Sequence, residues 1–112
     1  MAGRLGDGWG RRSTRMRVVW SPTAVADLVR LRAYIAEHDP SAASRIAVTL
    51  LQAVEKLRGF PAMGRPGRLP ETRELVVPGT PFVIPYRVGE GGLEIIAVMH
   101  GARKWPENPD GL

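Results

Sequence analysis

Two stretches in the first half of the chain carry apolar residues at the spacing of an amphipathic helix. The first stretch begins at Ser21-Pro22, where a serine N-cap precedes a proline at the first helical position, and it runs to about residue 38. The second begins with the same kind of start signal, an N-cap residue followed by proline, at Asp39-Pro40. It ends at Gly59, which we expect to act as its C-cap. The link between the two is short, so the helices should form an antiparallel hairpin.

Strand-like alternation of apolar and polar residues replaces the helical spacing after a proline- and glycine-rich loop over residues 60–71. Three strands are predicted, over residues 72–77, 82–88 and 93–100. The connections between them are of hairpin length and predict an antiparallel meander. Pro85 lies inside the middle strand and has no N–H to donate, so we expect a bulge or an unpaired stretch there.

The alternation also assigns side chains to faces of the predicted sheet. In the middle strand one face would hold Phe82, Ile84, Tyr86 and Val88, and in the last strand one face would hold Leu93, Ile95, Ala97 and Met99. A further short strand over residues 17–20 precedes the first helix. The predicted order is therefore β-α-α-β-β-β, and because two helices cover only one face of a small sheet, we predict a two-layer α+β domain with an open sheet face. Arginines would line that open face.

The composition narrows the classes of function. The chain has 112 residues, a formal net charge of +5 and no cysteine, which excludes disulfide scaffolds, thiolate metal sites and a cysteine nucleophile. Two histidines alone make a poor metal site, and no cofactor or metal is implied. No apolar run approaches the roughly 20 residues of a membrane helix, and no secretory signal is visible, so we expect a cytoplasmic protein.

The domain is expected to occupy residues 16–106. Residues 1–15 are rich in glycine and arginine without apolar periodicity and predict a disordered basic extension, and residues 107–112 predict a C-terminal tail. Met16 stands at the edge of the ordered pattern and is a candidate start site.

Common catalytic motifs are absent, including phosphate loops, nucleophile elbows and zinc-binding helices. His100 ends the last predicted strand and could act as a general acid or base, or could pack at the sheet end and bond a backbone carbonyl. A patch of basic residues could contact phosphates, or its members could be solvated side chains with no specific role; it comprises Arg65, Arg68, Arg73, Arg87, Arg103 and Lys104. Trp20 could stack on bases or fill the core.

Several short segments, in this order and spacing, resemble the RelE/ParE superfamily of bacterial type II toxins over residues 16–106. The resemblance is carried by Val19-Trp20-Ser21-Pro22-Thr23-Ala24, Gly64-Arg65-Pro66-Gly67-Arg68, Thr72-Arg73-Glu74-Leu75, Pro85-Tyr86-Arg87-Val88, Leu93-Glu94-Ile95-Ile96 and His100-Gly101-Ala102-Arg103. It implies a small toxin that a cognate antitoxin, encoded by the adjacent gene, binds tightly and inactivates, with two copies of each protein as a plausible assembly. We expect the antitoxin to bury an amphipathic segment on the helical hairpin or the open sheet face, with contacts at Leu28, Leu31 and Trp105.

The two branches of this superfamily differ in target. RelE-like members cut mRNA in the ribosomal A site, whereas ParE-like members poison DNA gyrase. RNA-cleaving members tend to have an arginine three residues before the position that matches Tyr86, and here that residue is Val83. The resemblance therefore favours a gyrase inhibitor that binds its target through Arg65, Arg68, Arg87 and Lys104. The alternatives are a ribosome-dependent mRNA endonuclease that uses His100, Arg73 and Arg103, and a degenerate, non-toxic family member.

Overall fold

The structure, a computed structural model, describes residues 16–101 of the chain. Two helices, α1 (Pro22–Ala36) and α2 (Pro40–Leu57), follow the first strand, and the remaining strands come after them. The strands are β2 (Arg17–Trp20), β3 (Arg65–Pro66), β4 (Thr72–Val76), β5 (Phe82–Gly89), β6 (Gly92–Ile95) and β7 (Met99–His100). The predicted extension, the predicted tail and the candidate residues Arg103, Lys104 and Trp105 lie outside the described residues.

The helical hairpin forms where the sequence predicts it, because its start signals are local. The Ser21 hydroxyl accepts a hydrogen bond from the Ala24 N–H at 3.0 Å, and the Asp39 carboxylate accepts one from the Ala42 N–H at 3.0 Å. The prediction of Gly59 as C-cap is wrong, because the cap is Arg58 in the right-handed helical conformation. Gly59 has no positive φ, and its N–H bonds the Lys56 carbonyl as any residue's could.

The strands form one mixed sheet in the order β2-β6-β5-β4-β3, and β7 also pairs with β5. The antiparallel meander of β4, β5 and β6 is as predicted. The sheet is not antiparallel throughout, since β2 lies parallel to β6 with Trp20 opposite Ile95. Strand β3 was not predicted, because it consists of two residues inside the loop and one of them, Pro66, has no N–H for a ladder.

A bulge separates β6 from β7, as the position of Pro85 predicts. Tyr86 faces Ile95 and Val83 faces Met99, so the three residues 96–98 lie opposite only Ile84 and Pro85. The extra residue exchanges the faces of the last strand. As a result Val98, which strict alternation would place on the face opposite Ile95, joins the core cluster with Ile95, while Ala97 is buried outside that cluster.

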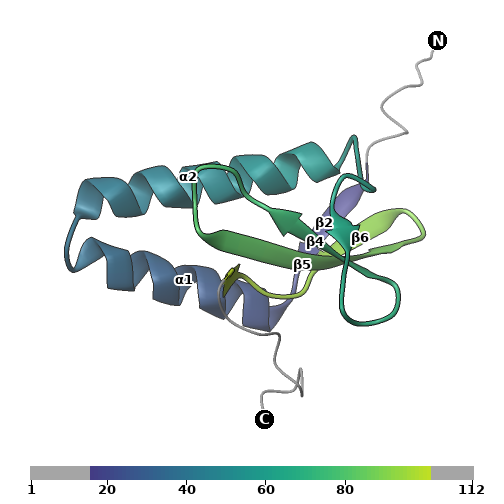
Figure 1. Ribbon diagram of the computed structural model, residues 1–112, viewed down its shortest axis with the longest axis horizontal. Helices are drawn as coiled ribbons and strands as arrows, with labels where there is room; N and C mark the ends of the chain where they lie inside the picture. The colour runs from purple at the N-terminus through teal and green to yellow at the C-terminus, as the bar shows by residue number, and fades with distance from the viewer. Residues whose placement is uncertain (1–15, 102–112) are drawn as a thin grey trace.

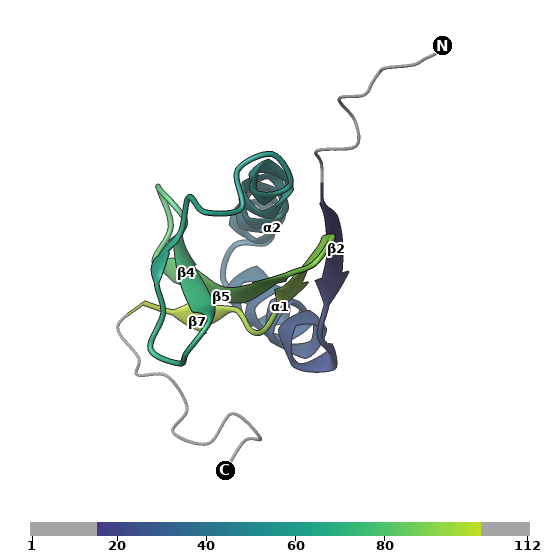
Figure 2. The ribbon, with the colours of Figure 1, turned by 90° about the vertical axis from the view of Figure 1, so that its right-hand side faces the viewer.

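Both helices pack on one face of the sheet, so the predicted two-layer α+β architecture is confirmed. The core joins one side of each helix to the alternate strand residues that face it: Ala24, Leu50, Val54, Leu57, Leu75, Val77, Ile84, Tyr86, Leu93, Ile95 and Val98. The closed end of the hairpin projects beyond the sheet (Figure 1), and the strands curve as a layer around one end of α2 (Figure 2). Neither helix in the described part of the chain is both long and apolar enough to cross a membrane.

Candidate functional site

The sheet face away from the helices carries two cross-strand ion pairs. The Arg65 guanidinium lies 2.9 Å from the Glu74 carboxylate, and the Arg87 guanidinium lies 3.0 Å from that of Glu94. Each pair consists of residues directly opposite each other in the ladder, which places both side chains on the same face. Two arginines of the predicted phosphate patch are therefore already neutralised within the sheet. Arg68 is exposed in the turn that follows β3.

Arg73 lies on β4 next to Glu74, so its side chain is on the opposite face of the sheet, where it is directed at the loop between α2 and β3. Its guanidinium donates hydrogen bonds to the carbonyl oxygens of Gly64 at 2.6 Å and Ala62 at 3.2 Å. Arg73 stands directly opposite Tyr86 in the ladder, so the two side chains are neighbours on one face. The basic residues of the predicted patch are thus divided between the two faces of the sheet.

Tyr86 is fully buried, and its hydroxyl bonds the same loop. The hydroxyl donates to the Pro61 carbonyl at 2.6 Å and accepts from the Gly64 N–H at 2.9 Å. Burial raises the pKa of the Tyr86 hydroxyl above its ordinary value of 10.0, and the Gly64 hydrogen bond and the positive charge of Arg73 oppose part of that rise. A proton-transfer role would require this hydroxyl to leave both of its partners.

Gly64 is a residue whose importance the sequence pattern did not reveal. A Cβ atom at this position would lie 2.7 Å from the Tyr86 hydroxyl and 2.9 Å from the Glu74 carbonyl, so the close approach of loop and sheet requires glycine. The glycine spacing of the loop was visible in the sequence, but the side chain that approaches it comes from a strand 22 residues later.

His100 is exposed at the end of β7, where its ring packs edge-on against Phe82 with a centroid distance of 5.9 Å. The register separates it from Arg73. His100 stands opposite Phe82 on one edge of β5, whereas Arg73 stands opposite Tyr86 on the other edge, four positions along the strand. Four residues of strand span roughly 13 Å, so the structure does not bring these two candidate catalytic residues together.

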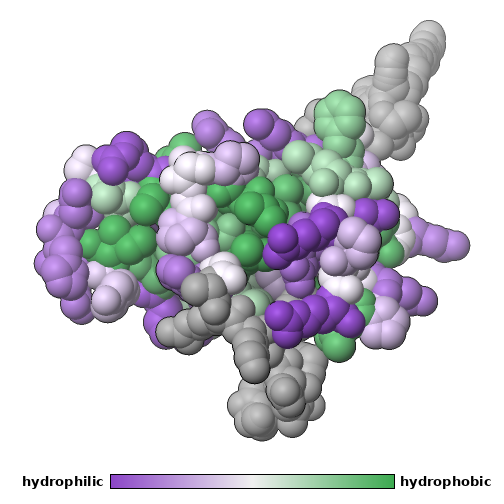
Figure 3. Space-filling model, in the orientation of Figure 1, coloured by the Kyte–Doolittle hydropathy of each residue, from purple (hydrophilic) through white to green (hydrophobic). Residues whose placement is uncertain are grey.

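A shallow apolar groove of about 720 Å³ runs between α1 and α2. Its lining includes the strongly exposed Val29 and Val48 and the half-buried Leu28, with Arg32 among the polar residues. Leu31, the other predicted contact on this helix, does not line the groove, and both Leu28 and Leu31 also pack against the core. Figure 3 shows apolar side chains along the hairpin, flanked by hydrophilic ones.

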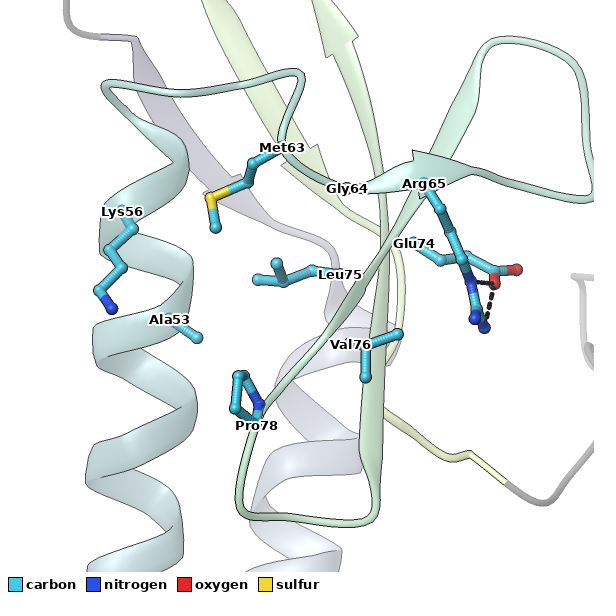
Figure 4. A pocket seen from close by; sticks show the side chains of 9 residues that line it. All are labelled: Ala53, Lys56, Met63, Gly64, Arg65, Glu74, Leu75, Val76 and Pro78. Carbon is cyan, nitrogen blue, oxygen red and sulfur yellow. Dashed lines mark hydrogen bonds and ion pairs between the residues drawn. The ribbon is translucent and has the colours of Figure 1, made fainter.

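A second, smaller pocket of about 280 Å³ lies between α2, the loop that follows it and β4 (Figure 4). Met63 extends from the loop toward α2, where Ala53 and Lys56 form the opposite wall, and Leu75 lies between them. The ion pair of Arg65 and Glu74 lies at the far side. Within residues 16–101 no cluster of acidic and histidine side chains could hold a metal ion.

Comparison with known proteins identifies the family. The family model described as the ParE toxin of the type II toxin-antitoxin system, parDE, matches residues 18–105. The chain belongs to this family. Y4kP of Sinorhizobium fredii is 43% identical over 94 residues, which cover 84% of this chain and 97% of that protein. Toxin RelE2 of Caulobacter vibrioides is 39% identical over 87 residues, which cover 78% of this chain and 97% of that one.

Two solved structures share the fold of this ParE-family chain. A chain of the chromosomal ParDE system from P. aeruginosa superposes with a TM-score of 0.73 at 25% identity, over 79% of this chain and 98% of that one. A chain of the toxin-antitoxin complex RelBE2 from Mycobacterium tuberculosis superposes with a TM-score of 0.60 at 24% identity, over 80% of this chain and 95% of that one. The resemblance drawn from the sequence motifs is thus confirmed at the level of the RelE/ParE superfamily.

Proposed function

We propose that this toxin acts as a binding protein that poisons DNA gyrase in the cytoplasm. Arg65, Arg68, Arg87 and Lys104 remain the predicted target contacts, although Arg65 and Arg87 each already pair with a glutamate across the ladder. The observation that carries the proposal is Val83, which stands at the position where RNA-cleaving relatives tend to have arginine. This residue is buried and lies opposite Val76 in the ladder. A phosphoryl-transfer site needs uncompensated donors aimed at the developing charge, and losing one such group costs on the order of 10²–10³ in rate.

A ribosome-dependent mRNA endonuclease is the second candidate, because two relatives carry the name toxin RelE, at 39% and 34% identity. It would use His100 as acid or base, with Arg73 and Arg103 on the phosphate. The Arg73 guanidinium, however, is engaged by two loop carbonyls, and His100 lies on the opposite edge of β5. For this activity the loop would have to release Arg73.

The antitoxin is proposed to occupy the groove between α1 and α2. A helix with an apolar stripe would cover the exposed Val29 and Val48 and reach Leu28, and a carboxylate on its rim would pair with Arg32. Leu31 and Trp105 remain predicted contacts. The two solved relatives come from ParDE and RelBE2 systems, and an assembly with two copies of each protein would fit the same arrangement.

Induction of the toxin in cells, with and without the adjacent antitoxin gene, tests the proposal. We expect growth arrest that the antitoxin relieves, together with loss of plasmid supercoiling and intact mRNA at ribosomal A sites. Toeprints at A sites with supercoiling unchanged would instead support the endonuclease. Unimpaired growth at confirmed expression would identify a degenerate family member.

A further inference from the structure

The loop that joins α2 to β3 exposes two large apolar side chains at its surface. Phe60 is 70% exposed and Met63 is 50% exposed, in a turn that the Met63 N–H closes by donating to the Phe60 carbonyl at 3.1 Å. Exposed apolar residues are ordinary when they stand singly, but these two share one turn that also borders a pocket. Their grouping calls for a physical explanation.

Hydrogen bonds to two strand residues fix the backbone of this turn. Tyr86 bonds the Pro61 carbonyl and the Gly64 N–H, while Arg73 bonds the Ala62 and Gly64 carbonyls. Four hydrogen bonds from two neighbouring strand residues therefore fix a turn of five residues. Because a binding loop that is ordered in advance loses less entropy on association, this arrangement favours recognition of a partner.

The adjoining pocket indicates which kind of partner fits. Its apolar lining includes Met63, the half-exposed Val76, and Pro78, which suits a large apolar side chain. On its α2 wall, Lys56 has no ion-pair partner among residues 16–101, whereas Arg65 is already neutralised by Glu74. The complementary ligand is a protein segment that carries an apolar residue next to a carboxylate, and not a nucleic acid.

We propose that the Phe60–Gly64 turn and its pocket form a recognition surface for the toxin's protein target, with Tyr86 and Arg73 as positioning residues. The inference rests on the proposed function only in taking the target to be a protein. The surface is separate from the inter-helix groove, because α2 contributes Ala53 and Lys56 here and residues 40–51 there. Target binding and antitoxin binding should therefore respond to different substitutions.

Three variants test the surface directly: the double change Phe60→Ser and Met63→Ser, the charge reversal Lys56→Glu, and Tyr86→Phe. The first two alter exposed side chains and should leave thermal unfolding nearly unchanged. We expect the Phe60/Met63 double variant and Lys56→Glu each to weaken growth arrest and gyrase inhibition at least about tenfold, as substitution of central interface residues does. Affinity for the antitoxin should stay within about twofold of that of the unchanged protein.

Tyr86→Phe tests the positioning role, because it removes only the hydroxyl. We expect faster amide exchange in residues 61–64 and target affinity about three- to tenfold lower, from the loss of two hydrogen bonds that order the turn. Tyr34→Phe is the matched control, since Tyr34 is the chain's other tyrosine and is exposed on α1. It should change neither quantity.

Val29→Ser in the inter-helix groove completes the design, with the opposite expectation of weaker antitoxin binding and unchanged growth arrest. Growth arrest serves as the readout whichever protein is the target, so absence of gyrase inhibition would refute the proposed function alone. The recognition surface is refuted if the Phe60/Met63 double variant arrests growth at the same dose as the unchanged toxin. It is also refuted if that variant loses antitoxin affinity in the same proportion.

Discussion

Asp27 on α1 provides a sharp test of how the helical layer is fixed to the sheet. Its carboxylate accepts a hydrogen bond at 3.0 Å from the N–H of Val98, which the bulge removes from the regular ladder. The other carboxylate oxygen accepts one from Arg30 at 2.6 Å. The perturbation is Asp27→Ala, with Arg30→Ala as the control that removes only the ion pair.

The expected magnitude follows from burial. The Asp27 side chain is 16% exposed and Val98 is buried, so truncation leaves a buried N–H unpaired, at a cost of about 1–3 kcal/mol. The Arg30 side chain is 71% exposed, and its ion pair contributes about 0.2–0.5 kcal/mol. For a domain of this size, a loss of about 2 kcal/mol lowers the Tm by about 8–16 °C.

Urea and thermal unfolding of the two variants, followed by circular dichroism, measure the difference. Asp27→Asn keeps an oxygen acceptor, so it should lie between Asp27→Ala and the unchanged protein. Equal loss of unfolding free energy in Asp27→Ala and Arg30→Ala would refute the reasoning, because the hydrogen bond to the bulge would then contribute nothing measurable.

Three further predictions concern the sheet and its loop. In urea titration, Arg65→Ala should lower the unfolding free energy by about 1–2 kcal/mol and Arg87→Ala by less than about 0.5 kcal/mol. The reason is that Glu74, the partner of Arg65, is 8% exposed, whereas Glu94, the partner of Arg87, is 47% exposed. Equal losses in the two variants would contradict this. Gly64→Ala should cost about 1–3 kcal/mol by forcing loop and sheet apart, whereas Gly59→Ala, with open space around it, should be neutral in the same assay. The raised pKa of the Tyr86 hydroxyl means that the folded state favours the neutral form of this group. The stability that the neutral hydroxyl contributes is therefore fully present below the ordinary pKa of 10.0 and is lost as the pH rises through the pKa of the folded state. Unfolding free energy should therefore fall more steeply above pH 10 in the unchanged protein than in Tyr86→Phe, and parallel curves would argue against it.

The parts of the fold that the sequence predicted are those set by local chemistry. The starts of both helices depend on a cap and a proline within three or four residues, so Ser21 and Asp39 mark them reliably. The bulge is likewise signalled by a proline at a fixed position. The parallel pairing of β2 with β6 depends on where the chain returns after both helices and three strands, and no local pattern contains that information.

The site was harder to predict because its contacts depend on register. A one-residue slip reverses the faces of a strand, so the pairing of Arg65 with Glu74 and the inward position of Val98 follow only from the observed ladder. Tyr86 was recognised as a motif residue, but its hydroxyl bonds a loop that precedes it by more than 20 residues. The sequence therefore supplied the candidate residues, and the tertiary structure supplied their partners.

A titration of purified DNA gyrase with the purified toxin tests the central claim most directly. The account predicts that supercoiling of relaxed plasmid declines with toxin dose and is restored when the antitoxin is added in excess. Supercoiling that is unaffected at toxin concentrations sufficient to cut mRNA on translating ribosomes would contradict it.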